Sequence, residues 1–350
     1  MADTVTLSLD RAGALAAAAF RAAGVAGPMA DDAGRALALA EAMGIPTHGL
    51  ARVDGYRKRL AAGGMNPAAR ITTRVAAPGL VRVNGEDGLG PAVATAALRA
   101  AMEAARTTGL AAAFCHRSTH FAAAAPYCLT AAEAGFASII LSSAAPSVAP
   151  PGGLAPRFGT NPMAFGMPGP AGRHVIFDTA LSVASRSRIR RAAGAGQPIP
   201  EGWATDRQGR PTTDAAAALD GLLQPLAGAK GYGLALVVDL FAGLLSGAAM
   251  LSDIADPERD PARPQDLGQM LLVIDTARLM PRDGLDGRMD HFAALIADTP
   301  AADPAHPVRL PGARALAALA RARSHGLSLP RPLHDGLVAA ATDAPAAQHD

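Results

Sequence analysis

The chain has 350 residues, a formal net charge of +2, and 50% hydrophobic but only 4% aromatic residues. This charge gives no electrostatic basis for binding nucleic acid or an anionic membrane, and the length allows roughly two domains. Much of the apolar content is alanine, so we expect helices to pack through close contacts. Two cysteines, Cys115 and Cys128, are too few for a disulfide framework and are expected to be reduced core thiols.

Neither a secretory signal nor a membrane span is evident from the sequence. The N-terminal segment carries Asp3 and Asp10 and lacks a basic start followed by an apolar stretch. The longest apolar run, 233–250, is interrupted by Asp239, which favours a buried helix over a membrane-spanning one. We therefore expect a cytoplasmic protein with no membrane partner.

Capping residues and apolar periodicity divide the chain into alternating helices and strands. Ser8 is a candidate N-cap, and Thr47 is another because it follows the helix breakers Gly44 and Pro46. The alternation predicts an α/β fold, in which residues 252–265 form an exposed connection. The predicted helices are 9–23, 29–43, 47–62, 91–108, part of 118–135 and 232–247, and the predicted strands are 81–83, 110–114, 137–142, 175–178 and 270–275.

The run from Thr47 to Arg52 is the most informative segment. In a helix over 47–62, His48 and Arg52 share one face because they are four residues apart, and Tyr56 continues that face. An imidazole titrates near neutral pH, and a guanidinium presents a planar fork to a carboxylate. The pair suits an enzyme that reduces a carbonyl beside a carboxylate. The alternative is a solvent-facing His and Arg on an amphipathic helix.

Several common catalytic motifs are absent. No strand is followed by the glycine-rich turn of a Rossmann fold, and there is no Walker A loop, nucleophile elbow or zinc-binding His-Glu-x-x-His helix. His116 and His120 stand four residues apart, but no third ligand is evident. We therefore predict no metal site.

Eight short motifs nevertheless follow one another in a specific order. They are Gly-Ile-Pro-Thr-His-Gly at 44–49, Ser-Thr-His-Phe at 118–121, Phe-Gly-Thr-Asn-Pro at 158–162, Asp-Thr-Ala-Leu-Ser at 178–182, Ile-Pro-Glu-Gly-Trp-Ala at 199–204, Gly-Arg-Pro-Thr-Thr-Asp at 209–214, Ala-Lys-Gly-Tyr-Gly at 229–233 and Leu-Pro-Gly at 310–312. This series resembles the malate/L-lactate dehydrogenase family. That non-Rossmann family includes ureidoglycolate and sulfolactate dehydrogenases and reductases of cyclic imine carboxylates.

The resemblance implies an α/β, non-Rossmann fold with a mixed central sheet and a helical layer from the N-terminus. It also implies a homodimer, a small-molecule carboxylate substrate, and hydride transfer with NAD or NADP. We expect residues 1–75 to form a helical segment that carries His48 and Arg52, and residues 76–308 to form the α/β core that binds cofactor and substrate. Residues 309–338 are expected to pack back on the N-terminal layer as a helical segment, and 339–350 to form a flexible tail.

The resemblance also suggests roles for individual residues. His48 matches the acid/base, Thr47 the hydroxyl beside it, and His120 either a second proton-transfer residue or a cofactor contact. The substrate-binding positions are Arg52, Thr160 and Arg186. The cofactor-binding positions are His120, Phe121, Ala122, Ala123, Ala124, Ser142, Asp178, Thr179, Ala180, Lys230 and Gly312.

The chain departs from the family pattern mainly at cofactor positions. Ala122 replaces a usual glycine, Ala313 a usual glutamate, Leu181 a usual threonine and Ser187 a usual glycine. The catalytic pair is kept, so we predict an NAD(P)-dependent oxidoreductase acting on a 2-hydroxy or 2-oxo acid resembling malate, lactate or sulfolactate. The alternatives are a reductase of cyclic imine-2-carboxylates of the Δ1-piperideine-2-carboxylate type, and a degenerate member that binds ligand without turnover. The sequence does not distinguish NAD from NADP.

Overall fold

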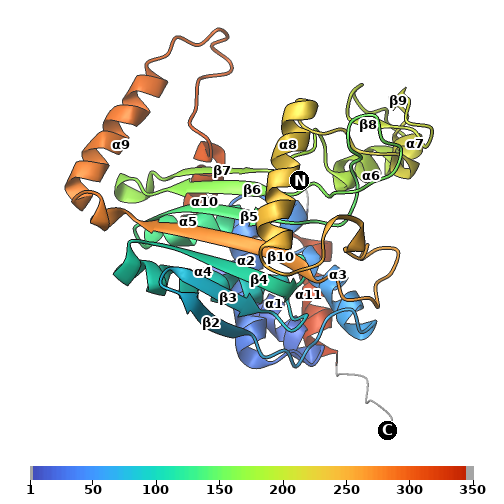
Figure 1. Ribbon diagram of the computed structural model, residues 1–350, viewed down its shortest axis with the longest axis horizontal. Helices are drawn as coiled ribbons and strands as arrows, with labels where there is room; N and C mark the ends of the chain where they lie inside the picture. Colours follow the sequence, from blue (N-terminus) through green and yellow to red (C-terminus); the bar gives the residue numbers. More distant parts are fainter. Residues whose placement is uncertain (1–2, 344–350) are drawn as a thin grey trace.

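A seven-stranded mixed sheet forms the centre of the computed structural model, which describes residues 3–343 (Figure 1). Its strands lie in the order β2-β3-β4-β10-β5-β6-β7. Neighbouring strands run antiparallel except β3 and β4, which are parallel. The predicted α/β fold with a mixed central sheet is confirmed. The strands are β2 (Thr72–Ala77), β3 (Leu80–Asn84), β4 (Leu110–Ser118), β5 (Phe136–Ser142), β6 (Met163–Met167), β7 (Val175–Thr179) and β10 (Leu267–Asp275).

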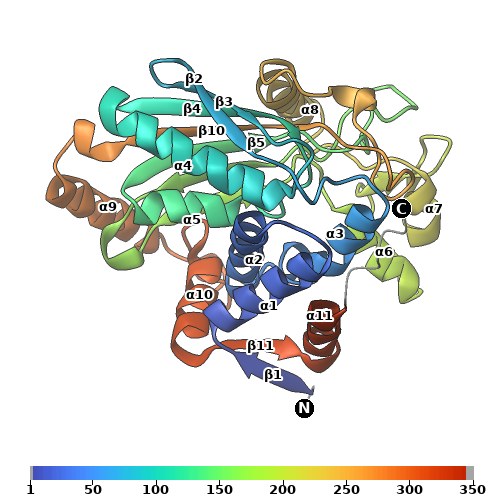
Figure 2. The same ribbon diagram turned by 90° about the horizontal axis from the view of Figure 1, so that it is seen from below.

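Both faces of the sheet are covered, and each face contributes to a separate apolar core. Helices α4 (Gly90–Thr108) and α5 (Ala125–Glu133) lie on one face (Figure 2). On β10, Leu271 and Val273 belong to the core on this side, whereas Met270 belongs to the second core. This division follows from the strand geometry, because successive side chains point to opposite faces. The second core includes Ala235 and Val238 of α8 (Ala229–Val238).

The N-terminal helices form an outer layer that the C-terminal segment completes. This layer contains β1 (Thr4–Leu7), α1 (Leu9–Ala22), α2 (Gly27–Ala42), α3 (Arg52–Ala61), α10 (Ala313–His325), β11 (Leu327–Pro330) and α11 (Arg331–Thr342). Strand β1 pairs antiparallel with β11, α11 packs on α1, and α10 contacts α2. Helix α11 continues to Thr342, beyond the boundary of 338 expected from the sequence. The rest of the expected tail, 344–350, lies outside the described residues.

The remaining elements lie beside the sheet. They are α6 (Arg186–Gly194), β8 (Ala204–Thr205), β9 (Pro211–Thr212), α7 (Ala215–Asp220), a π-helix after α8 (Asp239–Leu244) and α9 (Arg282–Ala297). The predicted helix 232–247 is therefore α-helical only to Val238. Within residues 3–343, no helix has the length and apolar character needed to cross a membrane.

Most predicted elements are confirmed within a few residues, but the helix predicted over 47–62 is wrong in its start and is helical only over Arg52–Ala61. Residues Pro46–His48 form a 3-10 turn, and α3 begins only at Arg52. Strands β2 and β6 were not predicted. Strand β6 reads Met-Ala-Phe-Gly-Met and has no β-branched residue, which removes the usual strand preference. Cys115 and Cys128 are buried free thiols, as predicted.

Close packing of α1 on α2 depends on a glycine. A Cβ atom added at Gly34 would lie 2.4 Å from the Gly13 carbonyl oxygen and 2.9 Å from the Ala17 nitrogen. We expect Gly34→Ala to lower the free energy of unfolding by about 1–3 kcal/mol, because the two helix backbones must separate. Urea denaturation measures this change.

The matched control is Gly287→Ala in α9, where an added Cβ meets no atom within 4 Å. This substitution is expected to raise the free energy of unfolding by about 0.4–1 kcal/mol, because alanine restricts the unfolded chain. Equal effects of the two substitutions would contradict the close approach of α1 and α2.

Candidate active site

His48 and Arg52 are brought together by a turn rather than by one helix face. Gly49 ends the 3-10 turn, and an added Cβ there would lie 2.2 Å from Glu41 Oε2. The Glu41 carboxylate accepts the Leu50 amide at 3.0 Å and so holds the turn. Arg52 Nε donates to the Thr47 carbonyl oxygen at 2.6 Å. Thr47 is therefore not an N-cap, and the N-cap of α3 is Ala51, which makes no side-chain capping bond.

The hydroxyl of Thr47 lies beside the first histidine, as the sequence suggested. Thr47 Oγ1 is 3.0 Å from His48 Nδ1. Burial lowers the pKa of His48 from its usual value to about 4, and the nearby positive charge of Arg52 acts in the same direction. The imidazole of His48 is consequently neutral at physiological pH in the ligand-free protein.

The second histidine faces the first. The ring centroids of His48 and His120 are 5.6 Å apart, with an angle of 32° between the planes. The pKa of His120 is lowered well below its usual value, first by burial and then by the charge of Arg52. The site thus combines two neutral imidazoles with one permanent positive charge, an arrangement that can exchange a proton near a bound carboxylate.

Tyr56 anchors the second histidine to α3, and the sequence analysis gave it no role of its own. Its hydroxyl lies 2.7 Å from His120 Nδ1 and donates to the His120 carbonyl oxygen at 3.0 Å. Burial raises the pKa of the Tyr56 phenol, which therefore stays protonated. The spacing of eight residues between His48 and Tyr56 was the available sequence signal for this contact. That spacing assumed one continuous helix, whereas His48 lies in a 3-10 turn and α3 begins at Arg52.

The loop after His120 is joined to the end of β7 by Asp178. One carboxylate oxygen of Asp178 accepts the amides of Ala124 and Ala125 at 3.0 and 2.8 Å, at the start of α5. Burial raises the pKa of Asp178, although these two amide bonds oppose the shift. Two separate motifs predicted to bind the cofactor therefore meet at one point.

A cavity of about 790 Å³ extends from this point. Its lining includes Gly44, Ala125, Asp178, Gly312 and Arg314. Gly312 has φ +83°, and an added Cβ would lie 2.5 Å from the Ile176 carbonyl oxygen. Only glycine lets the 310–312 segment lie this close to β7. The volume and mixed lining fit a dinucleotide, and the cavity contains two of the predicted cofactor-binding residues.

Other predicted site residues have different surroundings. The Ser142 hydroxyl is buried and donates to the Ser143 carbonyl oxygen at 2.9 Å, and Thr160 is half-buried. The Arg186 guanidinium donates to the carbonyl oxygens of Leu219 and Gly221 at 3.2 and 3.4 Å, and burial lowers its pKa. Among the hydrogen bonds of residues 3–343, none joins Arg186 to the two histidines. The contacts predicted for Ser142, Thr160 and Arg186 with substrate or cofactor stay predictions.

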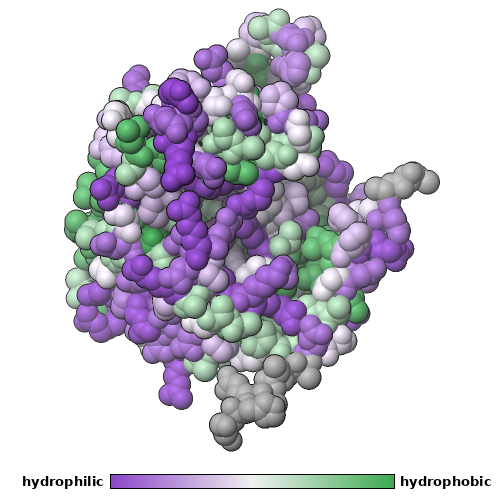
Figure 3. All heavy atoms as spheres, turned by 90° about the vertical axis from the view of Figure 1, so that its right-hand side faces the viewer, coloured by the Kyte–Doolittle hydropathy of each residue, from purple (hydrophilic) through white to green (hydrophobic). Residues whose placement is uncertain are grey.

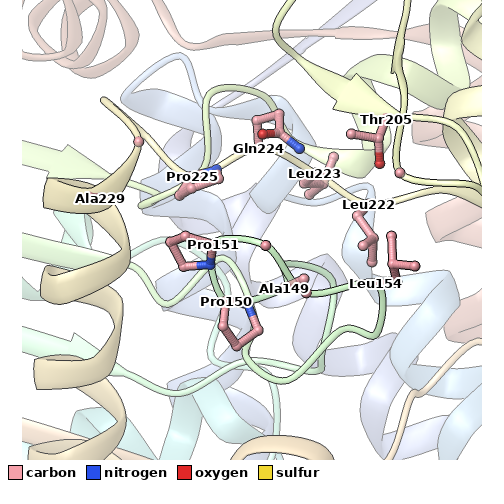
Figure 4. Close-up of a pocket in the computed structure, with 14 residues that line it drawn as sticks. Ala149, Pro150, Pro151, Leu154, Thr205, Leu222, Leu223, Gln224, Pro225 and Ala229 are labelled. Carbon is pink, nitrogen blue, oxygen red and sulfur yellow. The ribbon is translucent and has the colours of Figure 1, made fainter.

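Lys230 is exposed in the first turn of α8, next to a second cavity of about 420 Å³. Figure 4 shows this cavity between Pro150, Thr205 and Ala229, and none of the predicted site residues lines it. The face that carries α3, α6 and α7 is hollowed near its centre, and hydrophilic residues border the hollow (Figure 3). Within the described chain, no group of three potential metal ligands is present.

Asn161, in the predicted Gly-Thr-Asn-Pro turn, has a structural role that the sequence did not reveal. It is fully buried, has φ +37°, and donates to the Ala235 carbonyl oxygen at 2.9 Å and to Asp239 Oδ2 at 2.7 Å. Its side-chain Oδ1 accepts the Ala144 amide at 3.1 Å. Burial raises the pKa of Asp239 to about 6. Asn161 thereby fixes the turn that carries Thr160 against α8.

Ala122, at the usual glycine position, has φ +70°. This left-handed conformation is strained for alanine, by about 1–2 kcal/mol. We expect Ala122→Gly to raise the free energy of unfolding by up to about 1 kcal/mol, because the relief exceeds the extra entropy of the unfolded glycine. Urea denaturation measures the change, and Ala123→Gly, at a position without positive φ, is expected to be destabilising. A destabilised Ala122→Gly protein would contradict strain at this position.

Comparisons with known proteins agree with this geometry. A family model described as malate/L-lactate dehydrogenase matches residues 7–338. A Δ1-pyrroline-2-carboxylate reductase of Ancylobacter novellus is 36% identical, over 95% of this chain and 96% of the relative. A (2R)-3-sulfolactate dehydrogenase (NADP+) of Chromohalobacter salexigens is 37% identical, with the same two coverages.

The fold is also similar to that of solved structures. The crystal structure of the Δ1-piperideine-2-carboxylate reductase of Pseudomonas syringae has a TM-score of 0.87 and 30% identity, over 96% of this chain and all of that chain. The family match and these relatives each extend over nearly the whole chain. The chain therefore belongs to the malate/L-lactate dehydrogenase family and is an NAD(P)-dependent dehydrogenase or reductase.

Proposed function

We propose that this enzyme interconverts a small 2-hydroxy acid and its 2-oxo acid, with a malate-, lactate- or sulfolactate-like substrate. The observation that carries the proposal is the pair of neutral imidazoles, 5.6 Å apart, beside Arg52. The Arg52 guanidinium would bind the substrate carboxylate. When bound, NAD(P) supplies the hydride acceptor for the oxidation and the hydride donor for the reduction.

The neutral state of the histidines favours the oxidation of an alcohol. The substrate hydroxyl loses its proton as hydride leaves the carbon, so the site needs an unprotonated base. The proposed acid/base is one of two histidines whose rings face each other: His48, with Thr47 beside its Nδ1, or His120. In the reverse direction the same histidine must first bind a proton, which its low pKa makes less favourable in the ligand-free protein.

A reductase of cyclic imine-2-carboxylates is the second candidate, because two relatives of this chemistry match nearly the whole chain. A protonated imine carries its own proton on nitrogen, so its reduction requires hydride but no proton donor. The neutral histidines are compatible with this reaction, and Arg52 would bind the same carboxylate. The two candidates therefore differ in the pH dependence of the rate.

A homodimer is part of the same proposal. Large apolar side chains on α8 and the π-helix are 43–57% exposed, and such a patch is typical of a protein interface. The residues are Leu234, Val237, Leu240, Phe241, Leu244 and Leu245.

The pH profile of kcat/KM tests the reaction class. Because burial lowers the pKa of both histidines, that of His48 to about 4, hydroxy-acid oxidation should rise with pH only below about pH 5 and be flat from there to pH 8. A histidine with its ordinary pKa would place this rise near 6.5. Reduction of the matching 2-oxo acid should fall about tenfold per pH unit above pH 4, whereas imine reduction should follow only the protonation of the imine.

The assay uses malate, lactate, sulfolactate, their 2-oxo acids and Δ1-piperideine-2-carboxylate. Turnover of the imine alone would overturn the 2-hydroxy-acid proposal in favour of the second candidate. Cofactor binding without turnover of any compound would indicate a non-catalytic member. Arg52→Gln should lower kcat/KM about 10- to 100-fold, whereas Arg57→Gln, at an arginine that pairs with Asp343 at 3.2 Å, should not.

We also propose that the enzyme prefers NADP(H). Arg309 and Arg314 line the 790 Å³ cavity, and Ala313 stands where the family usually has a carboxylate. Guanidinium groups bind a phosphate through charge-assisted hydrogen bonds, and a neighbouring carboxylate would repel it.

Fluorescence titration should therefore give a dissociation constant for NADPH that is about tenfold or more below that for NADH. Arg309→Gln and Arg314→Gln should each reduce this difference. Arg321→Gln provides the control, because Arg321 is exposed on α10 but does not line the cavity. Equal affinities for the two cofactors in the unmodified enzyme would contradict the preference.

A further inference from the structure

The single proton of the Tyr56 hydroxyl determines the protonation of His120. The hydroxyl oxygen lies 2.7 Å from His120 Nδ1 and 3.0 Å from the His120 carbonyl oxygen. A carbonyl oxygen can only accept, so the phenol proton must point to it for this contact to be a hydrogen bond. The phenol oxygen then accepts a hydrogen bond from Nδ1, which must carry a proton.

The opposite arrangement is disfavoured by the same distances. If the phenol donated to Nδ1, two oxygen atoms would face each other at 3.0 Å without a proton between them. The His120 carbonyl would then have no other donor among the backbone hydrogen bonds of residues 3–343. Tyr56 is only 4% exposed and its ring stacks on Phe20, with centroids 6.3 Å apart, so the phenol cannot easily turn to another partner.

We propose that Tyr56 is a positioning residue that holds His120 in the Nδ1–H tautomer, leaving Nε2 unprotonated toward the substrate. This inference deepens the proposed function, on which the role of Nε2 depends. In hydroxy-acid oxidation, Nε2 of His120 would be the atom that accepts the proton of the substrate hydroxyl, which gives an imidazolium, and bound NAD(P) would supply the hydride acceptor. The proton on Nδ1 stays hydrogen-bonded to Tyr56.

The tautomer also influences what the site can recognise. An unprotonated Nε2 accepts a hydrogen bond from the hydroxyl of a 2-hydroxy acid or from the N–H of a protonated cyclic imine. A bare carbonyl oxygen offers no proton to it. His48 is not fixed in this way, because its Nδ1 contacts the Thr47 hydroxyl, which can either donate or accept. The two histidines therefore differ: Nε2 of neutral His120 can only accept a hydrogen bond, whereas His48 can either accept or donate one.

The test is a nitrogen-15 NMR measurement on histidine-labelled full-length enzyme, with the His120 signals assigned by their loss in His120→Gln. The unmodified protein should show a protonated Nδ1 and an unprotonated Nε2 on His120. In Tyr56→Phe the proton should move to Nε2 in a substantial fraction of molecules, because Nδ1 has lost its acceptor.

Tyr127→Phe is the matched control. Tyr127 is also buried and donates to a backbone oxygen of the same loop, that of Phe121, at 2.7 Å, but its hydroxyl makes no hydrogen bond to a histidine. The Tyr127→Phe substitution removes a comparable buried hydrogen bond and should leave the His120 tautomer unchanged. Tyr56→Phe should also lower kcat for hydroxy-acid oxidation about tenfold or more while changing the cofactor dissociation constant less than twofold.

An unprotonated Nδ1 in the unmodified protein would overturn the inference, and so would an unchanged His120 tautomer in Tyr56→Phe. The proposed function is tested separately by turnover. If the tautomer behaves as expected but no hydroxy acid is oxidised, the assignment of Tyr56 stands and the hydroxy-acid proposal fails.

Discussion

The contact between Tyr56 and His120 is the interaction on which the site depends. It joins α3, in the N-terminal layer, to the loop that follows β4 of the central sheet. Arg52 lies one helical turn before Tyr56, so the same contact brings the guanidinium close to both imidazoles. Burial between the two layers and the charge of Arg52 then lower the pKa of His48 and His120 together. Neither layer alone could produce this effect.

The cavity proposed for the cofactor depends on a second junction between distant parts of the chain. Asp178 holds the start of α5 through two amides, and the 310–312 segment lies against β7 because Gly312 has no side chain. Helix α10 then leads into β11, which pairs with β1. Residues 310–312 thus line the cavity, and the α10 and β11 that follow them complete the N-terminal layer. A change in the packing of that layer would therefore alter the shape of the proposed cofactor cavity as well as the positions of His48 and His120.

Among the departures from the family pattern, Ala313 lines the cavity and Ala122 lies in the loop after His120, so neither replaces a proton-transfer group. Ala122 keeps the left-handed backbone that a glycine would adopt without strain, so the loop conformation is preserved at an energetic cost. Ala313 removes a carboxylate from a cavity that Arg309 and Arg314 already make positive. Neither change touches the contacts among Thr47, His48, Arg52 and His120, which remain intact.

The family, the α/β class and most elements follow from the sequence alone, because ordered motifs and apolar periodicity are local properties of the chain. The sequence singles out His48, Arg52 and His120 as candidate site residues for the same reason. It gave the wrong local geometry, since the packing of Gly49 on Glu41 interrupts the expected helix. Three features come from the folded chain alone: Tyr56 contacts His120, Asp178 and Gly312 line one cavity, and Arg186 donates to the Leu219 carbonyl oxygen. These facts depend on contacts between residues far apart in the chain, which no local pattern encodes.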